Sequence, residues 1–272
     1  MKKLLLLSLL AGIFFIRCQS PREKIIATDT LLLDTIKIDT TDITCKDAKN
    51  ENCPNLHFGY PDFKIKDDSI NQYLNNETKQ ILLSHFDSAT TSVSAYIQSF
   101  FQLYHQDKLS IHQYDDLPGE YYSTIDITPA YKNKQYYTLV YTSDIFLGGA
   151  HPFGSQDYYV YDLSKLKKVV LSDILKTEDE NLWKLAEKYF RKELQISDSV
   201  SLADAGYFVL GENIEDEDSP DYGKFKLSQN FAITEKGILF LYNHYDIAPY
   251  AAGRQSFEIP FTELKPYLKI KL

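Results

Sequence analysis

The N-terminus is the feature that most constrains where and how this chain can fold. Two lysines, Lys2 and Lys3, are followed by a mostly apolar run from Leu4 to Ile16. That run is shorter than the roughly 20 apolar residues that a membrane-spanning helix needs. A basic start followed by a short apolar run is typical of a secretory signal peptide. We therefore predict that residues 1–17 are removed after export and that the remainder folds outside the cytosol.

Cys18 lies just beyond the apolar run, which is where a lipoprotein signal places the cysteine that becomes acylated. Arg17 is larger than the small residue expected before such a cysteine, so simple secretion is the alternative. The polar residues that follow predict a tether over 18–34. We expect a lipoprotein of the cell envelope that is held to a membrane by a lipid on Cys18 and faces the periplasm or the exterior.

The charge of the chain limits its partners. The formal net charge is −9, and the first 17 residues hold three basic and no acidic side chains, so the mature chain carries about −12. Such a chain is repelled by nucleic acid and by anionic lipid surfaces. We therefore expect no nucleic-acid partner.

Cys45 and Cys53 flank a polar, turn-rich stretch over 46–52. In an oxidising compartment, two cysteines at the ends of a turn between paired strands are placed to form a disulfide. We predict that this disulfide closes a hairpin, with two free thiols as the alternative. A metal site is a poorer interpretation, because only His57 lies near as a third ligand.

Aromatic residues and alternating patterns predict the fold class. The chain holds 21 tyrosines and 16 phenylalanines, which favour half-buried sheets. Apolar residues at helical spacing follow Asp67 and Asp68, either of which can cap the helix, and recur over 93–104. Thr177 and Glu180 form a possible capping box for a third helix. We predict strands over 121–128, 135–145, 157–163, 231–234, 237–244 and 256–261.

These elements predict an α+β fold in which a mainly antiparallel sheet packs against a few helices. We expect the folded domain over residues 35–272, either as one unit or as two lobes of about 35–118 and 119–272.

Two glycine-bearing loops stand out because each joins two predicted strands. The first runs from Phe146 to Phe153 and the second from Tyr245 to Gly253. Glycine allows positive φ or a close approach of the backbone, and aromatic rings anchor ligands. The candidate ligand-binding residues are Gly148, Gly149, His151, Tyr245, Asp246, Pro249, Tyr250 and Gly253.

The two loops also carry a family resemblance. Gly149-Ala150-His151-Pro152, followed by an aromatic strand and Asp162-Leu163, together with the segment from Tyr245 to Gly253, resembles the RsiV-like extracytoplasmic domain. In that family the domain forms the outer part of anti-sigma factors that sense lysozyme, precedes the catalytic domain of PdaC-type peptidoglycan deacetylases, and occurs alone in lipoproteins. The resemblance covers about residues 45–268. It implies an α+β domain with a partner in the envelope, either a peptidoglycan fragment or a lysozyme-like protein.

Three functions are open at this stage. We favour a binding or sensing module whose groove, lined by the two loops, holds a cell-wall glycan or a protein partner. The second is a peptidoglycan-active hydrolase or deacetylase-like enzyme with His151 and Asp246 as its acid/base pair. Each of those residues also has a structural interpretation, since His151 can fix its loop and Asp246 can cap its own turn. The third is a structural lipoprotein. We assign no catalytic residue, metal or cofactor.

Overall fold

The computed structural model describes residues 33–45, 53–88, 90–111, 121–133, 135–209, 224–225 and 227–270. The predicted signal peptide and Cys18 lie outside these ranges. Of the predicted tether over 18–34, only Leu33 and Asp34 are described, and they begin the first strand. Within the described ranges, no helix combines the length and the apolar character that crossing a bilayer requires.

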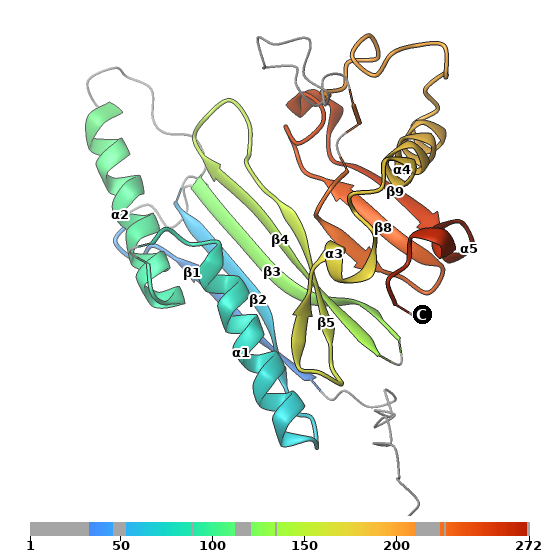
Figure 1. Cartoon of the computed structure of the whole chain (residues 1–272). Helices are drawn as coiled ribbons and strands as arrows, with labels where there is room; N and C mark the ends of the chain where they lie inside the picture. The colour runs from blue at the N-terminus through green and yellow to red at the C-terminus, as the bar shows by residue number, and fades with distance from the viewer. Residues whose placement is uncertain are drawn as a thin grey trace, which may run out of the picture.

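A six-stranded sheet forms the centre of the molecule, with its strands in the order β1-β2-β3-β4-β5-β6 (Figure 1). Only β2 and β3 are parallel, and every other neighbouring pair is antiparallel. The predicted disulfide between Cys45 and Cys53 is present at the turn between β1 and β2. The strands are β1 (Leu33–Thr41), β2 (Asn55–Phe63), β3 (Tyr121–Lys132), β4 (Tyr136–Leu147), β5 (Gln156–Asp162) and β6 (Lys167–Val169).

Helices α1 (Asp68–Ser84) and α2 (Val93–Ile111) cover one face of this sheet (Figure 1). The Asp67 side chain accepts hydrogen bonds from the backbone N–H groups of Ser69 and Ile70, so Asp67 is the cap of α1. Apolar side chains of both helices pack on aromatic and aliphatic side chains of β2, β3, β4 and β5. Burial of this stripe holds the helices on the sheet.

The opposite face carries a second layer built around a small antiparallel sheet (Figure 1). Its strands are β7 (Phe231–Ile233), β8 (Gly237–Tyr242) and β9 (Gln255–Pro260). The helices of this layer are α3 (Leu171–Ile174), α4 (Glu180–Glu193) and α5 (Phe261–Leu264), with short 3₁₀ turns η2 (Tyr250–Ala252) and η3 (Lys265–Tyr267). The predicted α+β class, with a mainly antiparallel sheet and a few helices, is confirmed.

The predicted capping box of Thr177 and Glu180 is wrong. Helix α4 begins at Glu180, and its cap is Asp179, whose carboxylate accepts a hydrogen bond from the backbone N–H of Asn181. The Thr177 carbonyl instead accepts a hydrogen bond from the indole N–H of Trp183 at 2.7 Å. That contact holds Thr177 outside the helix, so its hydroxyl does not take the capping position.

Strands β4 and β5 bury side chains on both faces of the large sheet, so this part of the sheet contributes to two hydrophobic cores. Tyr137 and Tyr161 belong to the core under α1 and α2, whereas their neighbours Tyr136 and Val160 belong to the core under the small sheet. This follows from the two-residue period of a strand, which sends successive side chains to opposite faces. The boundary between lobes near residue 118 stays a prediction, and lobes divided there share one sheet because β2 pairs with β3.

An ion-pair network on the solvent side of β1, β2 and β3 generates a prediction about protonation. The His57 Nδ1 lies 2.6 Å from Asp39 Oδ1, and its Nε2 lies 3.4 Å from Asp126 Oδ1. The hydrogen bond with Asp39 is the main cause that raises the pKa of His57; burial opposes it, and the charge of Asp126 adds to it. A raised folded-state pKa means that the network stabilises the fold below about pH 6.5 and that this is lost as pH rises through the folded-state value.

We therefore expect His57 to titrate above the ordinary histidine range when its ring protons are followed by NMR. The variant Asp39→Asn should lower the pKa of His57, because the charged partner is lost. Asp34→Asn, on the same strand and away from His57, is the matched control and should leave that pKa in place. An unchanged pKa in Asp39→Asn would show that the pairing does not exist in solution.

Candidate functional site

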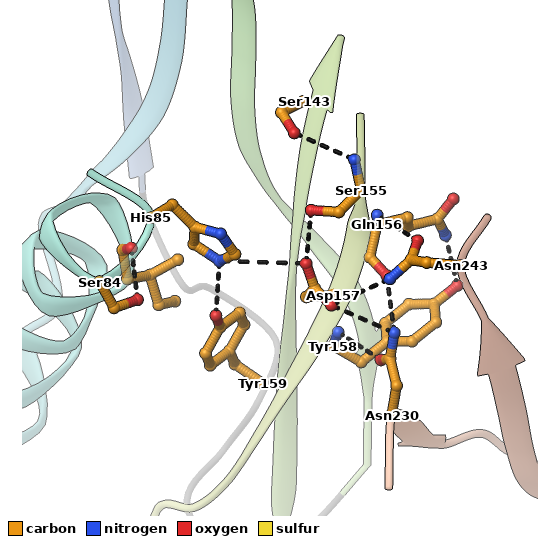
Figure 2. A network of polar contacts seen from close by, with 11 residues as sticks. Ser84, His85, Ser143, Ser155, Gln156, Asp157, Tyr158, Tyr159, Asn230 and Asn243 are labelled. Atoms are coloured by element: carbon orange, nitrogen blue, oxygen red, sulfur yellow. Dashed lines mark hydrogen bonds and ion pairs between the residues drawn. The ribbon is translucent and has the colours of Figure 1, made fainter. Parts of the chain in front are cut away.

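The outer edge of β5 is completed by side chains instead of by another strand. Gln156 and Tyr158 pair with β4 on one side, but on the other side β6 pairs only with residues 160–162 and leaves their backbone without a strand. Asn243 accepts a hydrogen bond from the Gln156 N–H at 2.8 Å, and Asn230 accepts one from the Tyr158 N–H at 2.9 Å. Both amide NH₂ groups donate to the Gln156 carbonyl, at 3.2 and 2.7 Å. Two asparagines thus replace the missing strand (Figure 2).

Asp157 connects this edge to the helical layer. Its Oδ1 accepts from Asn243 at 3.2 Å and lies 3.4 Å from the Asn230 amide, while its Oδ2 accepts from the Ser155 hydroxyl at 2.7 Å. His85, at the end of α1, lies 4.0 Å from the same carboxylate and is hydrogen-bonded to the Tyr159 hydroxyl at 2.8 Å (Figure 2). The network therefore joins α1, β5 and the loops beside β7 and β8.

His85 is a structural member of that network. Its ring stacks on Tyr141, with ring centres 3.6 Å apart. Burial lowers the pKa of His85; Asp157 opposes the shift and Lys168 adds to it. A lowered pKa favours the neutral ring, which can both donate and accept hydrogen bonds.

The two loops singled out in the sequence meet in space. The Tyr250 ring lies between two imidazoles: its centre is 3.7 Å from that of His151 and 4.4 Å from that of His244, both nearly parallel to it. Two rings that stack this closely on a third must occupy its opposite faces. The Tyr250 hydroxyl also donates a hydrogen bond to the Pro152 carbonyl at 2.9 Å. Tyr250 therefore joins the second loop to the first.

Backbone geometry explains some of the unusual residues in these loops. Gly148 and Gly253 have φ values of 74° and 73°, in the region that favours glycine, and Tyr245 adopts a φ of 67°. Gly149 does not need that region, and a Cβ atom there would have no other atom within 4 Å. Gly154, which the sequence analysis did not single out, is tightly constrained because a Cβ atom would lie 2.1 Å from the Ser143 carbonyl oxygen.

Beside His151 lies a cavity of about 500 Å³ between α2 and the first loop, which we call the loop cleft. Its apolar and aromatic lining is joined by a few polar groups, a composition typical of ligand sites. Phe153 is 66% exposed and Leu147 is 43% exposed, so the rim presents apolar surface to solvent. The lining residues are Asp87, Tyr96, Ser99, Phe100, Leu103, Ile145, Leu147, Gly149, His151 and Phe153.

Five other residues proposed from the sequence do not line the cleft: Gly148, Tyr245, Asp246, Pro249 and Gly253. Tyr245 is 54% exposed, and its ring centre lies 5.8 Å from that of Tyr250. Pro249 is exposed and directly precedes the turn η2. A larger cavity of about 950 Å³ lies elsewhere, lined by residues such as Tyr136, Phe261 and Lys265. It contains none of the residues proposed from the sequence.

His151 and Asp246 are not arranged as a proton-transfer pair. The Asp246 carboxylate accepts a hydrogen bond from the backbone N–H of Asn243 at 2.7 Å, so it caps its own turn. The His151 Nδ1 lies 3.0 Å from the Pro152 carbonyl oxygen. Both side chains are described, and no hydrogen bond or ion pair joins them. Among the described residues, no group of three or more His, Cys, Asp or Glu side chains is placed to hold a metal ion.

The hydrogen bonds that join Asn230 and Asn243 to the backbone of β5, which we call the asparagine clamp, generate a stability prediction. Asn243→Ala should lower the free energy of unfolding by about 1–2 kcal/mol, because the half-buried backbone groups of Gln156 lose their partner. Chemical denaturation measures this loss. Asn181→Ala, at an exposed position of α4, is the control and should change stability by less than about 0.5 kcal/mol. Equal effects of the two substitutions would contradict the role of Asn243.

Comparison with known proteins places this architecture among solved structures. A DUF3298 family protein from Bacteroides fragilis NCTC 9343 superimposes with a TM-score of 0.69 and 22% identity, covering 88% of this chain and 94% of its own. A DUF3298 family protein from Pseudomonas aeruginosa PAO1 gives a TM-score of 0.64 and 20% identity, covering 89% and 95%. At these identities the likeness shows a shared fold. No curated protein matches the chain significantly.

Two family models match the sequence in adjacent segments. The model described as deacetylase PdaC matches residues 48–154, which hold β2, α1, α2, β3, β4 and the first loop. The model described as a protein of unknown function, DUF3298, matches residues 172–262, which hold α4, the small sheet and the second loop. The resemblance noted in the sequence is thus confirmed: the chain is similar to the PdaC model over residues 48–154 and to the DUF3298 model over residues 172–262.

Proposed function

We propose that this protein is a binding module that holds a cell-wall glycan in the loop cleft. The observation that carries the proposal is the stack of His151, Tyr250 and His244, which fixes two distant loops beside a cavity with an aromatic rim. A rigid site built from several loops is suited to recognition, because little conformational freedom remains to be lost when a ligand binds.

The chemistry of the cleft suits a sugar chain. Phe153 presents an exposed ring, and the flat apolar face of a sugar packs well on such a ring. Ser99 is among the lining residues, and its hydroxyl, which donates to the Tyr96 carbonyl at 2.9 Å, can still accept a hydrogen bond from a sugar hydroxyl. The absence of a His151–Asp246 contact favours binding over acid/base catalysis at this position.

The location of the protein in the cell envelope is an expectation from the sequence. Anchoring by a lipid on Cys18 would hold the domain at the membrane, within reach of peptidoglycan. The Cys45–Cys53 disulfide supports folding in an oxidising compartment. The family model that matches residues 48–154 is named after a deacetylase, and this name is consistent with a protein that works close to cell-wall glycan.

A protein partner is the second candidate, and the exposed rim favours it. Leu147 and Phe153, which both line the cleft, are 43% and 66% exposed, and exposed apolar side chains gathered at one place indicate an interaction site. With a net charge of −9, the chain would attract a basic protein such as a lysozyme-like enzyme.

Co-sedimentation with purified peptidoglycan, followed by calorimetry with soluble chito-oligosaccharides, tests the glycan proposal. We expect the protein to sediment with the polymer and Phe153→Ala to weaken binding roughly ten-fold, because the exposed ring is lost. Val170→Ala removes a side chain that is 50% exposed and lies outside the cleft lining, so it should bind as the wild type does.

The outcomes separate the two candidates. Failure to bind either polymer or oligosaccharide would contradict glycan recognition. Binding of lysozyme that is lost in Phe153→Ala, without any glycan binding, would instead assign the same rim to a protein partner.

A further inference from the structure

Arg254, at the end of the second loop, is a cation that has no partner among the described residues. It directly follows Gly253 and leads into β9. Across the described part of the chain, its guanidinium makes no hydrogen bond or ion pair, and its Nε is buried and unpaired. Because the two terminal nitrogens are not among the buried unpaired atoms, they are open to solvent.

Arg191, the other arginine in the described part of the chain, is fully paired and serves as a comparison. Its Nε donates to Glu187 at 2.8 Å, and its Nη1 donates to the carbonyls of Ser197 and Val200 at 3.2 and 2.8 Å. Those contacts satisfy a guanidinium that is largely withdrawn from water. Arg254 is also partly withdrawn from water but has no such contacts. A cation in that position is costly unless an anion pairs with it.

A second unpaired nitrogen lies at the other stem of the same loop. Tyr242 of β8 pairs with Gln255 of β9, so the chain leaves the small sheet and returns to it side by side. His244 follows Tyr242 by two residues, and Arg254 precedes Gln255 by one. The His244 Nδ1 is buried without a hydrogen-bond partner among the described residues.

The ring stack connects these two side chains to the loop cleft. His244 stacks on one face of Tyr250, and His151, which lines the cleft, stacks on the other. The stack therefore leads from the cleft to the two stems of the second loop, on which His244 and Arg254 lie.

We propose that the terminal guanidinium nitrogens of Arg254, on the loop stem next to that of His244, form a subsite for an oxyanion carried by the ligand, a carboxylate or a phosphate. The inference rests on the proposed glycan-binding function and narrows it to an anionic cell-wall glycan. A guanidinium binds either group through two parallel hydrogen bonds, which are stronger than those between neutral partners. In a chain with a net charge of −9, an unpaired arginine beside a binding cleft gives the site a local preference for anions.

Calorimetry with matched ligands tests this subsite. One ligand is a disaccharide–tetrapeptide from peptidoglycan with free carboxylates, and the second is the same molecule with its carboxylates amidated. We expect the wild type to bind the acid form roughly ten-fold more tightly, the difference that one charge-assisted pair supplies. Arg254→Gln should abolish the difference, and Arg254→Lys should retain part of it. Lys188→Gln, at an exposed position of α4, changes the net charge equally and should preserve the full difference.

A glycerol phosphate oligomer distinguishes the source of the anion. Tighter binding of this oligomer than of the acid form, lost in Arg254→Gln, would support the subsite with phosphate as its natural group. Thermal melting checks that each variant is folded. If Arg254→Gln does not fold, the comparison of acid and amide forms in the wild type and in Arg254→Lys decides the question.

Two results would overturn the inference, and they are distinguishable from each other. If the wild type binds the acid and amidated forms equally and does not prefer the phosphate oligomer, the subsite is wrong but the glycan-binding function stands. A difference that persists in Arg254→Gln contradicts the subsite in the same way. If no ligand binds to the wild type, both the subsite and the proposed function fail.

Discussion

The pairing of two asparagine side chains with the free edge of β5 is the interaction on which the rest of the site depends. Backbone amides at the edge of a sheet need partners, and a strand normally provides them. Here Asn230 and Asn243 provide them for Gln156 and Tyr158. Because Asn243 directly precedes His244, this pairing also fixes where the second loop begins, and it places that loop against the first one.

This arrangement explains why the cleft lies where two layers join. At β4 and β5 the large sheet is buried on both faces, so ligands can reach this part of it only at its edges and loop ends. The first loop leaves the end of β4, and the second leaves the end of β8. Their contact through Tyr250 creates a surface that neither family segment has alone, because residues 48–154 carry His151 and residues 172–262 carry Tyr250. The two segments therefore have to fold together for the site to exist.

Local patterns predicted much of this architecture. Alternation predicted the strands that became β3, β4, β5, β8 and β9, and the cap at Asp67 and the Cys45–Cys53 disulfide followed from neighbouring residues. Both loops were recognised by their glycines and aromatic residues. The parallel pairing of β2 with β3 was not predicted, because two helices separate these strands. The cap at Asp179 was missed because Thr177 and Glu180 fit the capping pattern equally well.

No local sequence pattern could have predicted the asparagine clamp. Asn230 and Asn243 contact residues 72 to 87 positions away, and an asparagine near a strand end most often marks a turn. Arg254 is similar, since its lack of a partner is visible only in three dimensions.

The central claim is that the two loops meet through the Tyr250 ring, and nuclear Overhauser effects between aromatic protons measure this most directly. The account predicts cross-peaks from Tyr250 to both His151 and His244 in the folded protein. Cross-peaks to His244 alone, with none to His151, would show that the loops are apart in solution and would contradict the composite site.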